Sequence, residues 1–322
     1  MKILANDGLS QTGIDQLTNA GFTVVTDAVA QDQLIDAINQ ENYVGVLVRS
    51  ATTVRKEVVD ACPDLKFVGR GGVGMDNIDV EYARSKGIAV FNTPGASSQS
   101  VAELVMSHMF SLARSLYDSN RQMPQNGHEK FKDLKKKYGK GTELRGKTLG
   151  IVGFGRIGQA TASYALGCGM KVVTFDKNQG SNVIDLEIAG YGEISVEIPF
   201  VSLNELLKVS DIISLHVPKQ TDGSPVFGDS EIAKMKDGVL IINASRGGII
   251  DEDALLTALD SGKIGGAGLD VFMNEPTPRQ DLLDHPKVSL TPHVGAATGE
   301  AQDRIGVELA DQIMEVMNID AK

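Results

Sequence analysis

The stretch that decides the fold runs Thr148-Leu-Gly-Ile-Val-Gly153-Phe-Gly155-Arg-Ile-Gly158. Its apolar first part predicts a buried strand, and the G-x-G-x-x-G turn after it predicts the start of a helix. A second apolar run ends at Asp176. This order of elements is typical of a dinucleotide-binding βαβ unit: a strand, a glycine turn, a helix and a second strand that ends in an acidic residue. The unit stands in mid-chain, so the leading half is expected to carry part of the substrate site.

Three glycines give this turn its chemistry. Gly153 permits the tight turn, Gly155 lets the backbone approach a pyrophosphate, and Gly158 lets the helix pack close to its strand. The backbone amides that open the helix, those of Arg156 and Ile157, would face the phosphates. We therefore expect these five residues to bind the cofactor.

The acid at the end of the second strand bears on which dinucleotide binds. Asp176 stands where a carboxylate accepts hydrogen bonds from both hydroxyls of the adenosine ribose. Its negative charge would repel a 2′-phosphate, so the expected cofactor is NAD and not NADP. Lys177 follows directly and weakens this preference slightly.

Composition narrows the class of protein. A chain of 322 residues is long enough for two domains. The net charge of −11 argues against nucleic-acid partners, and no apolar run reaches the roughly 20 residues that span a bilayer. The first residues predict a strand and no signal peptide, and two scattered cysteines, Cys62 and Cys168, suit a reducing cytoplasm. Histidines and cysteines show no metal-ligand spacing, so no metal site is expected.

Both halves alternate strand and helix patterns, which predicts parallel sheets covered on both faces. In the first half, strands are expected at 2–5, 22–26, 45–48, 65–69 and 88–91, with helices near 14–20, 32–40, 56–61 and 80–85. In the second half, later strands are expected at 211–217, 239–243, 266–270 and 288–290, with helices at 203–209, 252–260 and 299–317. Ser202 and Asp251 are the expected N-caps of the helices that follow them.

Between the halves, a long helix is expected over 101–120, with Ser100 and Glu103 as a capping box. Residues 121–147 hold nine Lys or Arg against three Asp or Glu, and predict an exposed loop or short irregular helices. The predicted fold class is α/β with two doubly wound parallel-sheet domains. A Rossmann cofactor domain over 99–296 is inserted into a flavodoxin-like substrate domain formed by 1–98 and 297–322.

Three polar segments follow the later strands, at the edge where ligands bind to doubly wound sheets. They run Asn243-Ala-Ser-Arg246-Gly-Gly-Ile-Ile-Asp251, Asp270-Val-Phe-Met-Asn-Glu275-Pro and Thr291-Pro-His293-Val-Gly-Ala-Ala-Thr298. The acids, arginine and histidine in them are the candidates for chemistry on a cofactor-bound substrate.

Hydride transfer to a carbonyl needs a proton donor for the developing alkoxide, and His293 fits because an imidazole titrates near neutrality. Glu275 fits as the carboxylate that favours the protonated ring and fixes its orientation. Arg246 fits as a planar fork of donors for a substrate carboxylate. Each residue alone could be structural, but together with the nucleotide turn they favour a hydride-transfer site.

With these motifs in this order, the chain resembles the D-isomer-specific 2-hydroxyacid dehydrogenases over nearly its whole length. The resemblance gives Arg246, Glu275 and His293 the catalytic roles named above. The cofactor contacts that it further implies come from Pro218, Ala244, Ser245, Asp270 and Gly295. His216, which ends a strand ahead of Pro218, is expected to line the cofactor cleft, whereas His108, His128 and His285 are expected to be structural or at the surface.

The first half matches the same family in two segments, Arg49-Ser50-Ala-Thr-Thr and Arg70-Gly-Gly72-Val-Gly74. Successive amides of Gly72, Val73 and Gly74 would form a nest for a carboxylate, although an ordinary glycine turn is the alternative. Arg49 and Arg70 both follow strands and would converge on a second anion. The expected substrate-binding residues are therefore Arg49, Ser50, Arg70, Gly72, Val73 and Gly74.

The resemblance is strongest to the phosphoglycerate dehydrogenase branch, so the expected reaction is NAD-dependent oxidation of 3-phosphoglycerate to 3-phosphohydroxypyruvate, which opens serine biosynthesis. The chain stops at Lys322, before the regulatory module that this branch often carries. The alternatives are an unphosphorylated substrate such as glyoxylate or hydroxypyruvate, and an NAD-gated interaction protein of the corepressor type. The long helix over 101–120 and the family indicate a homodimer or a dimer-based homo-oligomer, and the two scattered cysteines indicate a cytoplasmic protein. Whether Lys135–Lys137 contact substrate or only solvent stays open.

Overall fold

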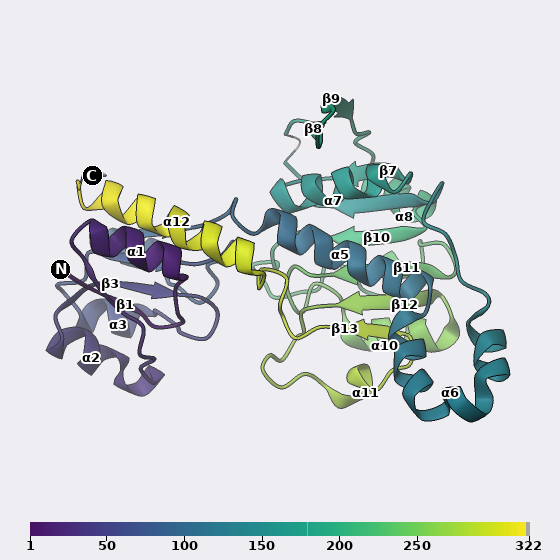
Figure 1. Ribbon diagram of the computed structural model, residues 1–322, viewed down its shortest axis with the longest axis horizontal. Coiled ribbons are helices and arrows are strands. Elements are labelled where there is room, and N and C mark those ends of the chain that lie inside the picture. Colours follow the sequence, from purple (N-terminus) through teal and green to yellow (C-terminus); the bar gives the residue numbers. More distant parts are fainter. Residues whose placement is uncertain (179, 320–322) are drawn as a thin grey trace. The chain divides into compact units, whose positions relative to one another are not determined.

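The computed structural model describes residues 1–178 and 180–319. That part of the chain forms two compact units, shown in Figure 1. The first joins Met1–Ser100 to the residues from Ala296 onward, and the second is Val101–Gly295. Along the sequence the second unit is thus an insertion in the first. No helix of the described residues is long and apolar enough to cross a membrane, and the thiols of Cys62 and Cys168 are free.

The first unit is built on a parallel sheet of five strands in the order β2-β1-β3-β4-β5, counted within the described residues. These strands are β1 Lys2–Ala5, β2 Thr23–Val25, β3 Tyr43–Val48, β4 Phe67–Arg70 and β5 Ala89–Asn92. Its helices are α1 Gln11–Asn19, the short 3-10 turn Gln31–Gln33, α2 Leu34–Gln40, α3 Lys56–Ala61, α4 Val80–Ser85 and α12 Gly299–Val316. The strand order reverses between β1 and β3, as in a flavodoxin-like sheet.

Alternating side chains of this sheet supply two apolar layers. Leu4 and Val46 pack on the side of α2, α3 and α4, whereas Ile3 and Leu47 pack on the side of α1 and α12. Successive residues of a strand face opposite ways, so a strand covered on both faces is apolar throughout. Helices α1 and α12 lie side by side (Figure 1), and a Cβ at Gly13 would lie 2.8 Å from the backbone of Gly306. The carboxyl-terminal helix therefore completes the core begun by the first hundred residues.

The second unit is built on a parallel sheet of six strands, again counted in the described part of the chain, in the order β13-β12-β11-β10-β6-β7. They are β6 Thr148–Val152, β7 Lys171–Phe175, β10 Ile212–Leu215, β11 Val239–Asn243, β12 Ile264–Leu269 and β13 Val288–Leu290. Its helices are α6 Leu116–Tyr138, α7 Arg156–Gly167, α8 Leu203–Val209, α9 Asp229–Ile232, α10 Glu252–Ser261 and α11 Gln280–Leu283, with most of α5 Ser98–Ala113. The order reverses between β6 and β10, which marks the ligand-binding crevice of such a sheet. The α/β fold class with two parallel sheets is thus confirmed.

The segment between the halves departs from expectation. Helix α5 begins at Ser98, so Ser100 lies inside the first turn and the predicted capping box there is wrong. The expected helix over 101–120 is interrupted at Ser115, whose φ of 49° lies in the left-handed region. Residues predicted as loop then form α6, which is kinked at Lys130. Glutamine, lysine and leucine favour a helix, and this outweighs Pro124 and the absence of a broad apolar face.

Sequence reading also missed a hairpin between β7 and α8. Strands β8 Val183–Ile188 and β9 Gly192–Glu197 pair antiparallel, and Figure 1 shows them standing out beside α7. Ile184 at the hairpin's base is buried in the core under α7, whereas Ile188 and Tyr191 near the tip are exposed. By contrast, the two predicted N-caps of later helices are confirmed. The Ser202 side chain accepts a hydrogen bond from the Glu205 amide, and the Asp251 side chain accepts hydrogen bonds from the amides of the first turn of α10.

Candidate active site

The glycine turn joins β6 to α7, and each glycine meets a different constraint. Gly153 has a φ of +93°, and a Cβ there would lie 2.4 Å from the carbonyl oxygen of His216. A Cβ on Gly158 would lie 2.3 Å from the oxygen of Gly153. A Cβ on Gly155 would meet nothing within 4 Å. Two glycines are therefore required by the protein's own packing, whereas the third borders open space at the helix start.

Helix α7 presents its first amides beside that space. Gly155 is its N-cap residue, and Arg156 and Ile157 open the first turn. The first amides of a helix have no intrahelical acceptor, and the helix dipole favours an anion in front of them. The pyrophosphate of a dinucleotide would fit here, because the space over Gly155 is open and the first amides of α7 face it.

Asp176 lies directly after β7 and is tied to the same turn. Its Oδ2 accepts from the Phe154 amide at 2.6 Å, and its Oδ1 accepts from the Asn178 amide at 2.8 Å. A carboxylate has about four acceptor positions, so these two bonds leave capacity for ribose hydroxyls. The acid is thereby held in place before any ligand arrives.

His216 directly follows β10, and its backbone lies against the glycine turn. Its amide donates to the Val152 carbonyl at 2.7 Å, and its ring Nε2 lies 2.9 Å from the Ser214 hydroxyl. Nδ1 is buried and has no hydrogen-bond partner among the described residues. Burial lowers the pKa of His216 to about 4, so the ring is neutral at physiological pH. Pro218 follows two residues on, past the end of the strand.

The loop after β11 is organised by Asn243. Its side chain accepts from the Ser245 amide at 3.1 Å and from the Ser245 hydroxyl at 2.8 Å, and donates to the Arg246 carbonyl at 2.8 Å. A Cβ on the next residue, Gly247, would lie 1.7 Å from the carbonyl oxygen of Phe272. The Ala244–Arg246 turn therefore packs directly on the loop that carries Glu275.

His293 and Glu275 form the central pair of the site. Nδ1 of His293 lies 2.7 Å from Oε2 of Glu275, and Oε1 of Glu275 accepts from the Phe272 amide at 2.8 Å. Burial raises the pKa of Glu275, but the bonds from His293 and the Phe272 amide outweigh it and lower the pKa below its usual value. The carboxylate thus stays ionised through the neutral range, and Nε2 of His293 is the ring nitrogen that can exchange a proton.

One side of this pair is apolar. A cavity of about 410 Å³ lies against it, lined by Phe272, Glu275, Pro276, Pro278, Leu283, Leu290, Thr291, Pro292 and His293. An apolar wall lowers the local dielectric and strengthens the attraction between imidazolium and carboxylate.

Asp270, at the end of β12, holds the backbone next to His293. Its buried carboxylate accepts from the amides of Val294 and Gly295 at 2.8 and 2.9 Å, and from the Thr291 hydroxyl at 2.7 Å. His293 itself has a φ of 54°, a left-handed conformation that a non-glycine residue adopts only when its surroundings enforce it. Sequence reading missed Thr291 as the side chain that completes this hold.

In the first unit, Arg49 lies against Gly71 and Arg70 lies against Gly72. A Cβ on Gly71 would come 3.5 Å from Arg49 Cγ, and one on Gly72 only 1.6 Å from Arg70 Nη1. The amide of Gly72 donates to the Thr93 hydroxyl at 2.8 Å. Of the predicted anion nest, this amide is therefore already engaged, which leaves the amides of Val73 and Gly74 for a ligand.

Asp7 is a further residue that sequence reading missed. Its carboxylate accepts from the amides of Arg49 and Thr52, at 2.6 and 3.1 Å, and so fixes the loop that contains Ser50. The signal was present, because Asp7 follows β1 at the carboxyl edge of the sheet, where ligand-binding loops gather.

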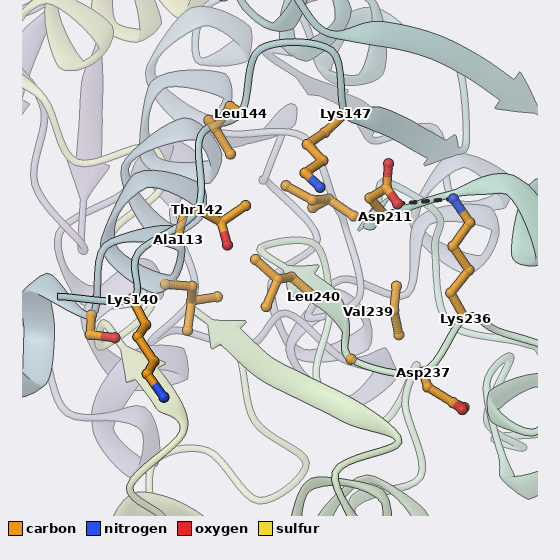
Figure 2. Close-up of a pocket in the computed structure, with 14 residues that line it drawn as sticks. Ala113, Lys140, Thr142, Leu144, Lys147, Asp211, Lys236, Asp237, Val239 and Leu240 are labelled. Carbon is orange, nitrogen blue, oxygen red and sulfur yellow. Dashed lines mark hydrogen bonds and ion pairs between the residues drawn. The ribbon is translucent and has the colours of Figure 1, made fainter. Parts of the chain in front are cut away.

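A second cavity in the inserted unit, of about 310 Å³, lies at the opposite, amino-terminal edge of its sheet. Figure 2 shows Lys147 pointing into it and Lys236 paired with Asp211, at 2.9 Å. Since dinucleotides bind at the carboxyl ends of the strands, this cavity is no part of the candidate site. Lys137, in α6, forms an ion pair with Asp118 at 2.7 Å.

The chain is similar to known proteins over most of its length. Residues 106–295 match the model of the D-isomer specific 2-hydroxyacid dehydrogenase NAD-binding domain. The chain is 41% identical to a hydroxypyruvate reductase of Thermotoga maritima, over 99% of both chains. It is 38% identical to a D-3-phosphoglycerate dehydrogenase of Synechocystis, over 98% of this chain but 54% of that protein.

Among solved structures, a glyoxylate reductase from Paecilomyes thermophila superposes with a TM-score of 0.82 at 28% identity, over 98% of this chain and 95% of that one. Together these matches make the protein an oxidoreductase that acts on the CH–OH group of 2-hydroxy acids with a nicotinamide dinucleotide. The chain belongs to the D-isomer specific 2-hydroxyacid dehydrogenase family.

Proposed function

We propose that the protein oxidises 3-phosphoglycerate to 3-phosphohydroxypyruvate with NAD, the entry reaction of serine biosynthesis. The observation that carries the proposal is the pair of half-buried arginines, Arg49 and Arg70, against Gly71-Gly72. Two guanidinium groups suit a dianionic phosphate far better than a neutral substituent. The resemblance of the chain to phosphoglycerate dehydrogenases, which it covers for about half of their length, supports the same substrate.

In the proposed mechanism the described side chains handle charge and protons. Arg246 holds the substrate carboxylate with its planar fork. Nε2 of His293 takes the proton of the 2-hydroxyl group during oxidation and returns it during reduction. Glu275 keeps the ring oriented through Nδ1 and stabilises its charged form. A bound nicotinamide supplies the acceptor for the hydride.

The arginine pair gives a direct test of the substrate. Arg49→Ala should lower kcat/KM for 3-phosphoglycerate by about 30-fold or more, because a charge-assisted hydrogen bond contributes about 2 kcal/mol. The same variant should change kcat/KM for D-glycerate by less than about three-fold, since that substrate has no phosphate. Arg55→Ala is the matched control, because Arg55 pairs with Asp79 at 3.1 Å on the same unit. An equal loss of kcat/KM on both substrates would show that Arg49 does not bind the phosphate.

A second candidate is reduction of hydroxypyruvate or glyoxylate. It is favoured by the Thermotoga hydroxypyruvate reductase, which matches this chain from end to end, whereas the phosphoglycerate dehydrogenases are nearly twice as long. Under this reading, kcat/KM for hydroxypyruvate exceeds that for 3-phosphohydroxypyruvate, and Arg49→Ala leaves it unchanged.

We further propose that the cofactor is NAD, on the basis of Asp176 and its fixed carboxylate. Asp176→Asn keeps the shape and one acceptor but removes the charge that repels a 2′-phosphate. The ratio of kcat/KM with NAD to that with NADP should fall by about ten-fold or more. Asp185→Asn, on the exposed face of the β8–β9 hairpin, is the control. An unchanged ratio would remove Asp176 from cofactor selection.

A homodimer is proposed on the apolar side chains that α5 and α6 expose. Phe110, Leu116, Met123 and Phe131 are between 43% and 59% exposed. Exposed large apolar side chains on successive helices offer a surface for packing against a second copy of the chain. Sedimentation equilibrium should give twice the chain mass for the wild type, and Phe131→Glu should shift it toward the monomer. A wild-type monomer would contradict the proposal.

The two free thiols support placement in a reducing compartment such as the cytoplasm.

A further inference from the structure

Helix α5 carries a histidine, His108, on its buried face, only 3% exposed. Its ring makes two hydrogen bonds to the strand and loop that lead to His293. Nδ1 lies 2.9 Å from the Ser289 hydroxyl, and Nε2 lies 3.0 Å from the Thr291 hydroxyl. Sequence reading placed His108 among structural or surface histidines, and none of the proposed catalytic steps uses it.

We propose that His108 is a positioning residue for the catalytic loop: through Thr291 it fixes the Asp270 carboxylate, which in turn holds the backbone beside His293. The proposal rests on the proposed role of His293 in proton transfer. All of these groups lie in the inserted unit, within a continuous chain of hydrogen bonds.

The donor and acceptor of each hydrogen bond in this series follow from the Asp270 carboxylate, with which the series ends. The Asp270 carboxylate is an acceptor, so Thr291 donates to it and must itself accept from His108 Nε2–H. Nδ1 of the neutral ring is then bare and accepts from the Ser289 hydroxyl. Burial lowers the pKa of His108, with the charge of Asp270 acting weakly in the opposite sense, and this keeps the ring neutral. This tautomer therefore satisfies both ring nitrogens of His108 and the Thr291 hydroxyl.

The last link reaches the catalytic residue. Asp270 binds the amides of Val294 and Gly295, the two residues after His293. These bonds maintain the left-handed backbone of His293, whose φ is 54°. If Thr291 loses its donor from His108, its hydroxyl can rotate away from Asp270, and the loop is then held by two bonds in place of three. A displacement of about 1 Å in a catalytic group can cost about 100-fold in rate.

Two near-isosteric variants separate positioning from packing. The side-chain nitrogen of glutamine comes close to the place of histidine Nε2, so His108→Gln keeps the donor to Thr291. The shorter asparagine reaches only the place of Nδ1, so His108→Asn keeps the contact with Ser289 and loses the one with Thr291. Met109→Leu, a buried change at the next position of α5, is the control for packing.

Steady-state kinetics on the full-length protein gives the first readout. For His108→Asn we expect kcat to fall by about ten-fold or more, with KM for the 2-hydroxy acid changed by less than about three-fold. His108→Gln should restore kcat to within about three-fold of the wild type, and Met109→Leu should leave it unchanged. An unaltered kcat in His108→Asn, or an equal loss in His108→Gln, would overturn the proposal.

Hydrogen exchange supplies a readout that does not depend on turnover. In mass spectrometry, the peptide that contains Val294 and Gly295 should exchange faster in His108→Asn than in the wild type, and His108→Gln should retain its protection. Equal exchange in all three proteins would overturn the relay. A wild type without turnover on any 2-hydroxy acid refutes the proposed function instead, and the exchange data then still decide whether the relay holds the loop.

Discussion

In the His293→Ala variant we expect kcat for oxidation of the 2-hydroxy acid to fall by about 10³-fold, because no group remains to take the hydroxyl proton. Nδ1 of the ring is bound to Glu275 at 2.7 Å, so the lost function is that of Nε2. The Kd for NAD, measured by calorimetry, should change by less than about three-fold, since the residues expected to hold the pyrophosphate and the adenosine ribose, Gly155 and Asp176, lie on other loops.

Glu275→Gln provides a graded comparison for the same claim. It keeps the size of the side chain but removes the charge that stabilises the protonated ring, so its loss in kcat should be smaller than that of His293→Ala. If His293→Ala instead weakened NAD binding and left kcat at saturating NAD unchanged, the assignment of His293 to proton transfer would be wrong.

The second large effect concerns the glycine turn, where two alanine variants should behave oppositely. In Gly155→Ala the new methyl group enters open space, so the Tm of the free protein should stay within about 1 °C. The same methyl group lies where the backbone must approach a pyrophosphate, so the Kd for NAD should rise by about ten-fold or more.

Gly153→Ala should instead destabilise the protein in the absence of any ligand. Its φ of +93° is unfavourable for alanine, and the Cβ would lie 2.4 Å from the backbone oxygen of His216. A loss of about 2 kcal/mol or more corresponds to a Tm lower by about 5 °C or more. Undiminished NAD affinity in Gly155→Ala would mean that the pyrophosphate does not lie over this turn.

Local patterns made much of this architecture predictable. The glycine turn and Asp176 are fixed by spacing within one βαβ unit, and alternating strands and helices imply the parallel sheets. The errors were local too. The period-two patterns of β8 and β9 are visible in the sequence. The α6 segment lacks strand and core signals, which predicts a loop, whereas its glutamine, lysine and leucine residues favour the helix that forms.

Long-range partners could not be derived in the same way. The hydrogen bonds of His108 reach Ser289 and Thr291, about 180 residues away, and no sequence pattern near His108 predicts them. Gly247 reads as an ordinary turn glycine, yet its contact with the Phe272 carbonyl joins the loops of Arg246 and Glu275. The engaged amide of Gly72 likewise depends on Thr93, on a different strand end.

The most direct test of the central claim is NADH formation, followed by absorbance, when the purified protein and NAD are given 3-phosphoglycerate or the D and L forms of other 2-hydroxy acids. We expect NADH with 3-phosphoglycerate and with D substrates only, and no NADH in the His293→Ala variant. Absence of NADH with every D-2-hydroxy acid, or equal rates with D and L forms, would refute the proposed function.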